Sequence, residues 1–134
     1  MAMSMWKTLK YAFTNHCETR ENHEDEELRS HYYKATNRAV IDAVKELLSS
    51  LPDAELVSVS EERGEICAQT RRGKKLFIVA TVISVRPFET AVDFSATTET
   101  KLLPFDFGHS RAVILDLYRK LDARLPYIGS GLNS

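Results

Sequence analysis

Apolar residues recur every three or four positions in two segments of this chain, which is the spacing of a helix with one buried face. The first segment spans residues 36–51, and Thr36 or Asn37 can cap its first turn. It ends before Pro52, because proline disfavours helical geometry in the residue that precedes it. The second segment spans residues 110–125 and also ends before a proline. The apolar faces comprise Val40, Val44, Leu47, Leu48 and Leu51 in the first helix, and Val113, Ile114, Leu117, Tyr118, Leu121 and Leu125 in the second.

Between these helices the hydrophobic pattern changes to the alternation typical of strands. Short turns separate the segments, and Gly64 in the first turn is suited to a positive φ. The third segment carries apolar residues on both of its faces, so we place it centrally or covered on both sides. The four predicted strands span residues 56–60, 65–71, 74–85 and 90–98.

The order of these elements predicts an α+β fold. Short connections between successive strands favour a four-stranded antiparallel meander, and the simplest arrangement packs both amphipathic helices on one face of that sheet. The predicted order is arm, helix, four strands, helix. We divide the chain into a partly irregular N-terminal arm at residues 1–33, a single α+β domain at 34–128 and a flexible tail at 129–134. Tyr32 and Tyr33 either anchor the arm onto the domain or line a groove, and we favour anchoring.

Composition and charge narrow the function classes. The chain has 134 residues and a net charge of -1, from 18 basic and 19 acidic residues, which argues against non-specific nucleic-acid binding. Two cysteines are fewer than a secreted disulfide scaffold normally carries. The apolar run at 76–85 is too short to span a bilayer as a helix, and Lys7 and Lys10 interrupt the apolar N-terminal stretch that a secretory signal needs. We therefore expect a cytoplasmic protein with no membrane association.

The stretch FDFGHSR at residues 105–111 precedes the second helix and has two interpretations. In the structural one it starts the helix, with Ser110 or Asp106 as the N-cap. In the functional one it binds an anion, because backbone N–H groups at Gly108 and charge-assisted bonds from His109 and Arg111 would face a phosphate or carboxylate. The candidate ligand-binding residues are Asp106, Gly108, His109, Ser110 and Arg111.

The pattern D-x-G-x-S-R at residues 106–111 resembles the D-x-G-x-N-R signature of the domain of unknown function 1499 family. The segment N-H-C-E-T at residues 15–19 resembles that family's N-C-V-S-[ST] segment, with a histidine inserted beside the cysteine. The helix and antiparallel strands between the two motifs follow in a similar order. The family has no established activity, so the resemblance implies that the arm and the start of the last helix are special, and it implies no reaction.

The arm also gathers residue types that bind metals. His16, Cys17 and His23 are the candidate ligands, with His109 as a further ligand from across the fold. Structural zinc sites usually show tighter spacing and a Cys-x-x-Cys pair, which this arm lacks, so an exposed polar arm is the competing interpretation. A Cys17 nucleophile with His109 as its base is a third arrangement, but the sequence does not bring the two together.

Two classes of function stay open. We favour a non-catalytic binding or interaction module that takes an unidentified protein partner or a small acidic ligand. A homodimer is a further arrangement, since an open meander leaves strand edges to be paired. The alternative is a small metal-dependent or hydrolytic enzyme that uses the arm and residues 106–111. The predicted strands carry few polar candidates for catalysis, namely Gln69, Asp93 and Ser95, and no cofactor is expected.

Overall fold

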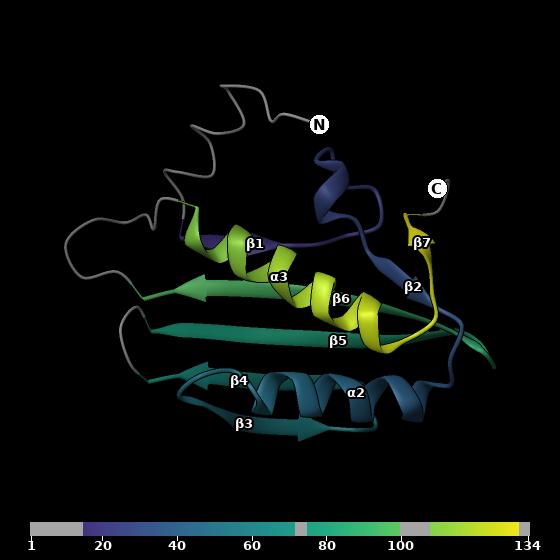
Figure 1. Cartoon of the computed structure of the whole chain (residues 1–134), viewed down its shortest axis with the longest axis horizontal. Helices are drawn as coiled ribbons and strands as arrows, with labels where there is room; N and C mark the ends of the chain where they lie inside the picture. Colours follow the sequence, from purple (N-terminus) through teal and green to yellow (C-terminus); the bar gives the residue numbers. More distant parts are fainter. Residues whose placement is uncertain (1–14, 72–74, 100–107, 132–134) are drawn as a thin grey trace.

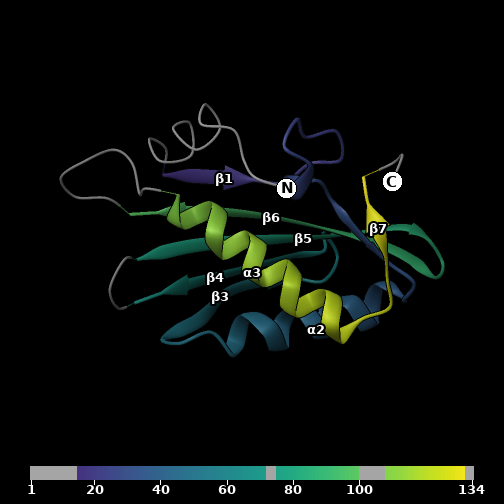
Figure 2. The same ribbon diagram turned by 45° about the horizontal axis from the view of Figure 1, so that its top comes forward.

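The computed structural model describes residues 15–71, 75–99 and 108–131, which form one antiparallel sheet with two helices on one of its faces (Figure 1). Helix α2 spans Asn37–Ser49 and helix α3 spans His109–Arg124, close to the predicted positions. Both helices lie on the same side of the sheet when the molecule is turned (Figure 2). The strands are β1 (His16–Glu18), β2 (His31–Tyr33), β3 (Ala54–Ser60), β4 (Glu65–Thr70), β5 (Leu76–Arg86), β6 (Glu89–Thr98) and β7 (Tyr127–Ser130), and η1 (Glu26–Leu28) is a short 3-10 helix.

The predicted four-stranded meander is wrong, because the sheet has seven strands. Strands β3 to β6 do form a meander, but the order continues as β3-β4-β5-β6-β2-β7, and β1 also pairs with β6. The additional strands come from the predicted arm and from the residues around the predicted tail. They have three or four residues each, too few to show a periodicity of two in the sequence.

Two short strands share the outer side of β6. Strand β1 pairs with its second half, where Cys17 lies opposite Ala96, and β2 pairs with its first half, where Tyr32 lies opposite Ala91. Together they cover an edge that would otherwise present unpaired backbone groups. Strand β7 then pairs with β2, so the segment that follows α3 joins the sheet beside the predicted arm. The arm is therefore part of the sheet.

The hydrophobic core lies between the sheet and the two helices. Thr36 caps α2 by accepting a hydrogen bond from the Ala39 N–H at 3.2 Å, as predicted. Tyr33 is fully buried, which confirms that it anchors the arm. The largest fully buried side chains are Tyr33, Phe94, Leu28, Leu47, Leu48, Ile66, Ile78, Ile114, Leu117, Leu121, Val40 and Val44.

Helix α3 starts differently from the prediction. Its N-cap is Gly108, with φ of 82°. This left-handed backbone conformation favours glycine. Ser110 lies inside the helix and is buried, so it is not the N-cap, while the other predicted cap, Asp106, lies outside the described residues.

Residues 19–30 leave the sheet between β1 and β2 and return to it, and a buried ion pair fastens this loop to α3. Arg111 donates from Nε and Nη2 to Asp25 Oδ2, at 3.2 and 3.1 Å. Both side chains are almost fully buried, at 11% and 6% exposed. The Asp25 backbone N–H donates to His23 Nδ1 at 3.0 Å, so the ion pair belongs to a compact polar cluster.

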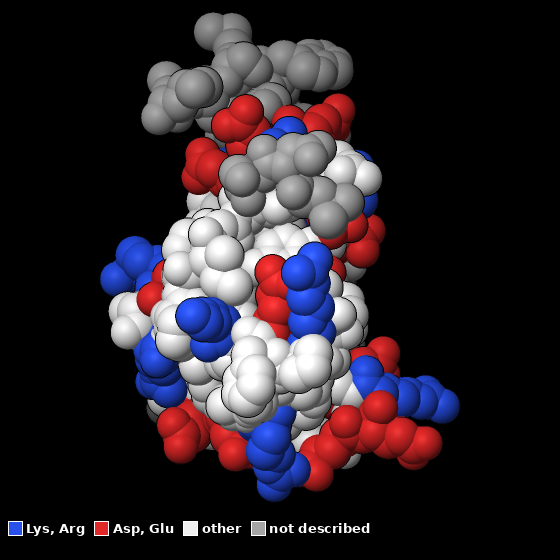
Figure 3. All heavy atoms as spheres, turned by 90° about the vertical axis from the view of Figure 1, so that its right-hand side faces the viewer, with Lys and Arg blue, Asp and Glu red and all other residues white. Residues whose placement is uncertain are grey.

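Charges of both signs occur at the end of the molecule formed by β7 and the β5–β6 turn (Figure 3). Figure 3 shows basic and acidic side chains interspersed there over a largely uncharged surface. Arg86 Nε and Glu89 Oε2, which face each other across that turn, lie 3.2 Å apart. Among the helices of the described residues, none combines the length and the apolar character needed to cross a bilayer.

The ion pair between Arg111 and Asp25 gives a stability prediction. Arg111→Met should lower the free energy of unfolding by about 3 to 5 kcal/mol, because it leaves a buried carboxylate without its cation. Urea denaturation followed by circular dichroism measures this change. Arg119→Met is the matched control, because Arg119 is an exposed arginine of the same helix, and it should cost about 1 kcal/mol or less. Equal losses in the two variants would contradict the structural role of Arg111.

Candidate functional site

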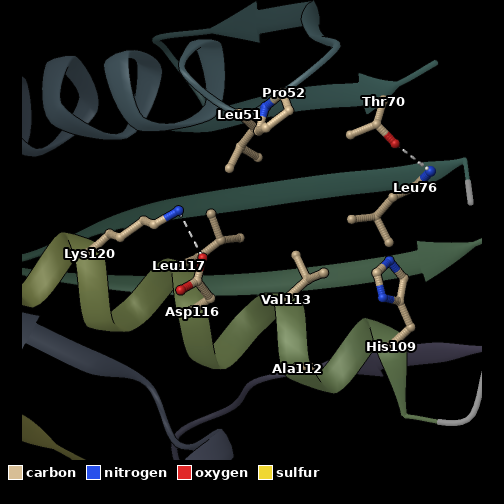
Figure 4. A pocket seen from close by; sticks show the side chains of 10 residues that line it. All are labelled: Leu51, Pro52, Thr70, Leu76, His109, Ala112, Val113, Asp116, Leu117 and Lys120. Atoms are coloured by element: carbon tan, nitrogen blue, oxygen red, sulfur yellow. Dashed lines mark hydrogen bonds and ion pairs between the residues drawn. The ribbon is translucent and has the colours of Figure 1, made fainter. Parts of the chain in front are cut away.

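A cavity of about 470 Å³ lies on the helix side of the sheet, between α3, the chain that follows α2, the end of β4 and the start of β5 (Figure 4). Its middle is apolar, and its polar side chains lie toward two ends. His109 lies near Leu76 and Thr70 at one end, and Asp116 and Lys120 lie at the other (Figure 4). The lining residues are Leu51, Pro52, Thr70, Leu76, His109, Ala112, Val113, Asp116, Leu117 and Lys120.

The period of α3 explains why one helix supplies most of this lining. Its contributing residues follow each other at alternating steps of three and one, so they share a single face. The opposite wall is held by a hydrogen bond at 2.9 Å from the Leu76 backbone N–H to Thr70 Oγ1, which joins β4 to β5. Leu51 and Pro52 reach the cavity because the helix before them ends at Ser49. The cavity therefore depends on secondary structure on both sides.

At one end of the cavity the lining residues Asp116 and Lys120 form an ion pair, and Arg119, which is outside the lining, shares the same carboxylate. Asp116 accepts hydrogen bonds from Lys120 at 2.9 Å and from Arg119 at 2.5 Å. The hydrogen bond from Lys120, and then that from Arg119, lower the pKa of the Asp116 carboxyl below its ordinary value. Asp116 is thus ionised at neutral pH and balances one of the two cations, which leaves the other unbalanced within this group of three.

The structure separates the residues that the sequence grouped at the start of α3. Gly108 caps the helix, His109 lines the cavity, and Ser110 is buried. The Arg111 guanidinium is committed to Asp25, with Glu27 at 3.5 Å. Of the predicted anion-binding set within the described residues, His109 alone belongs to the cavity lining, and Asp106 lies outside those residues.

The candidate metal ligands are likewise spread over the arm. His16 is exposed and its Nδ1 lies 2.6 Å from Thr97 Oγ1, whereas its neighbour Cys17 is buried in the core. His23 is buried in the loop and its Nδ1 accepts from the Asp25 N–H. In the part of the chain that the structure describes, no group of three or more His, Cys, Asp or Glu side chains is arranged to hold a metal ion.

A second polar group, which the sequence did not indicate, joins β2 to the last turns of α3. Asp122 Oδ1 accepts from the Tyr33 hydroxyl at 2.6 Å and lies 2.9 Å from His31 Nδ1. The His31 ring stacks on Tyr118, with ring centroids 3.6 Å apart and planes inclined by 4°. The sequence signal for this group was that His31 and Tyr33 are two residues apart, which places them on the same face of a strand. Only the fold brings Asp122 beside both of them.

The tyrosines of this group are held in their neutral form. Burial, followed by the hydrogen bond to Asp122, raises the pKa of Tyr33 far above its ordinary value. Burial also raises the pKa of Tyr118, whose hydroxyl donates to the Val92 carbonyl at 2.7 Å. This arrangement is suited to fixing β2 against α3, because its groups bond one another within the protein.

No family model matches this chain, and no curated protein matches it. The resemblance to the domain of unknown function 1499 family stays a prediction from the two short motifs.

The buried tyrosines predict a loss of stability in alkaline solution. Their pKa values are higher in the folded than in the unfolded chain, so the stabilisation is complete below pH about 10 and is lost as the pH rises above it. Tyr33 and Tyr118 should each contribute a decrease of up to about 1.4 kcal/mol per pH unit in the free energy of unfolding. Denaturant titrations between about pH 9 and about pH 11 measure the slope.

Tyr33→Phe is the control for this prediction. It removes one titrating phenol, so its slope above pH about 10 should be shallower than that of the wild type. A wild-type chain that ionises all five tyrosines near pH 10 while remaining folded would contradict the assignment.

Proposed function

We propose that this protein is a non-catalytic binding module whose ligand, a small acidic molecule with an apolar body, occupies the cavity along α3. The observation that carries the proposal is the cavity itself. Its volume of about 470 Å³ is in the range of ligand pockets, and such pockets combine a mostly apolar lining with a few polar groups that orient the ligand. The apolar body would lie against Val113, Leu117 and Leu76.

The charges at the ends favour an acidic ligand over a basic one. Lys120 lines the cavity, and the neighbouring Arg119 shares the Asp116 carboxylate with it. A ligand carboxylate near Lys120 would add a second anion to two cations, which is a favourable charge balance. At the other end His109 stands in the first turn of α3, where the helix dipole also favours negative charge.

The predictions of a cytoplasmic location, a protein partner and a homodimer are compatible with this proposal. A cytoplasmic location suits a chain in which neither Cys17 nor Cys67 forms a disulfide. A protein partner and a homodimer are compatible with a small-molecule site on one side of the sheet. No contact among the described residues specifically favours the alternative of a metal-dependent or hydrolytic enzyme.

The proposal predicts that filling the cavity abolishes binding of an aromatic acid. Ala112→Trp places a large side chain at the lining, whereas Ala123→Trp makes the same change at an exposed position of α3 outside it. Isothermal titration with 2-naphthoate should show binding to the wild type and to Ala123→Trp, and a Kd at least about tenfold weaker for Ala112→Trp, or about 1.4 kcal/mol. Equal affinity for the two tryptophan variants would place the ligand elsewhere.

The charge argument has its own test. Lys120→Met removes the cation at the lining and keeps much of the apolar stem. It should weaken binding of 2-naphthoate while leaving that of the neutral 2-naphthalenemethanol nearly unchanged. A parallel loss for both compounds would mean that Lys120 contributes packing alone, and failure of the wild type to bind either would refute the proposal.

A further inference from the structure

Strand β5 presents apolar side chains to both faces of the sheet, although helices cover only one of them. On the helix side the buried residues of β5 are Leu76, Ile78, Ala80 and Val82. On the other side Phe77 and Ile83 are 42% and 45% exposed, and Val79 and Thr81 lie between them. A strand that faces water on one side normally alternates apolar and polar residues, whereas near-continuous apolar runs are typical of strands covered on both sides. This pattern indicates that the helix-free side of β5 is covered in the assembled protein.

The neighbouring strands extend this surface, which we call the β5 face. The register places Gln69 and Thr97 beside Phe77, and Cys67 and Ser95 beside Val79. All four of these neighbours are uncharged. The β5 face is defined by Phe77, Val79, Thr81 and Ile83 of β5, Cys67 and Gln69 of β4, and Ala91, Ser95 and Thr97 of β6.

In the row of Thr81, acidic residues occupy the strands on both sides of β5. One strand further out, Glu18 of β1 pairs with Ser95 and Glu55 of β3 pairs with Gln69. Glu65 on β4 and Asp93 on β6 both pair with Thr81, so one acidic residue lies on each side of Thr81. Asp93 is held there by hydrogen bonds from Thr19 at 2.7 Å and Ser30 at 2.5 Å. Any occupant of the β5 face must therefore avoid placing negative charge over the row of Thr81.

We propose that a second copy of this chain covers the β5 face, with the two β5 strands antiparallel and a twofold axis crossing them near Ala80. Sheets that pack face to face keep their strands within about 30° of each other. In this arrangement Phe77 of one copy lies over Ile83 of the other, and Val79 lies over Thr81. The interface is isologous, since each copy contributes the same patch.

Charge selects the antiparallel orientation. The acidic row of Thr81 then faces the row of Val79 in the second copy, whose flanking residues Cys67 and Ser95 are neutral. Parallel β5 strands would instead place Glu65 of each copy against Asp93 of the other, which brings four carboxylates together. Like charges at an interface cost several kcal/mol. The antiparallel orientation thus keeps the carboxylates beside β5 from facing one another, whereas the parallel orientation brings them together.

This inference is independent of the proposed ligand site. The cavity lies between the sheet and α3, whereas the β5 face is on the opposite side of the sheet. Loss of one should leave the other intact, so the two proposals fail separately.

The first test is the oligomeric state of the full chain by sedimentation equilibrium. We expect a concentration-dependent dimer, and Ile83→Lys should weaken it at least about 30-fold, because the twofold symmetry brings a lysine against Phe77 of the other copy at both ends of the interface. Val59→Lys is the control, because Val59 is an exposed apolar residue that pairs with Ile66 on the helix side. Circular dichroism tests whether each variant is folded. If Ile83→Lys does not fold, Phe77→Lys replaces it in the same experiment.

Two results would overturn the proposal. One is a wild-type chain that stays monomeric up to about 1 mM, the weakest association that counts as binding on the usual affinity scale. The other is a dimer that a folded Ile83→Lys or Phe77→Lys variant retains at wild-type strength, because the dimer would then use another surface.

The native thiol of Cys67 tests the orientation. In the antiparallel arrangement the Cys67 residues of the two copies lie on the same flank of β5, separated mainly by the spacing of about 10 Å between packed sheets. A short bis-maleimide should crosslink the wild-type dimer and fail with Cys67→Ser, since the other cysteine, Cys17, is only 4% exposed. A dimer whose Cys67 reacts with a mono-maleimide but is never crosslinked would overturn the antiparallel orientation.

Discussion

The Asp93 carboxylate lies halfway along β6, at the gap between the two short strands that pair with the outer side of that strand. Its Oδ1 accepts hydrogen bonds from the hydroxyls of Thr19, just after β1, and of Ser30, just before β2. The Thr19 hydroxyl in turn accepts from the Phe94 backbone N–H at 3.0 Å. One carboxylate thereby joins both ends of the loop at 19–30 to the middle of the sheet. This polar constraint on the register of two three-residue strands acts beside the burial of Cys17 and Tyr33.

The position of α3 follows from this arrangement. The returning loop carries Asp25, which pairs with Arg111 in the first turn of the helix. At the far end His31 and Tyr33 of β2 hold Asp122 in the last turns. The helix is therefore fixed at both ends by residues of the arm, while its middle turns face the cavity. The position of the α3 residues that line the cavity therefore depends on polar contacts made by residues outside the lining.

The sequence pattern predicted the elements whose periodicity extends over several turns or pleats. Both helices and the four central strands were found near their predicted positions. Gly64 has the positive φ expected of it, 69°, and a Cβ there would also meet the Val82 carbonyl oxygen at 2.2 Å, so both features favour glycine. The strands of three or four residues could not be predicted, since their identity depends on which edge they meet in space. The structure separates His109 from Arg111, which the sequence joined as one site, for a different reason. A helix turns by 100° per residue, so these two point to different surroundings.

The sheet also explains why the proposed small-molecule site and the proposed interface can coexist in so short a chain. A two-layer α+β fold uses one side of its sheet for the core and leaves the other side to be solvated or covered. The cavity arises where α3 and the end of α2 diverge over β4 and β5, and thus belongs to the helix layer. The apolar residues on the reverse of β5 add nothing to that core, because their side chains point away from both helices. Large apolar side chains such as Phe77 and Ile83 are a solubility cost on an exposed strand, and that cost disappears when a second sheet packs against them.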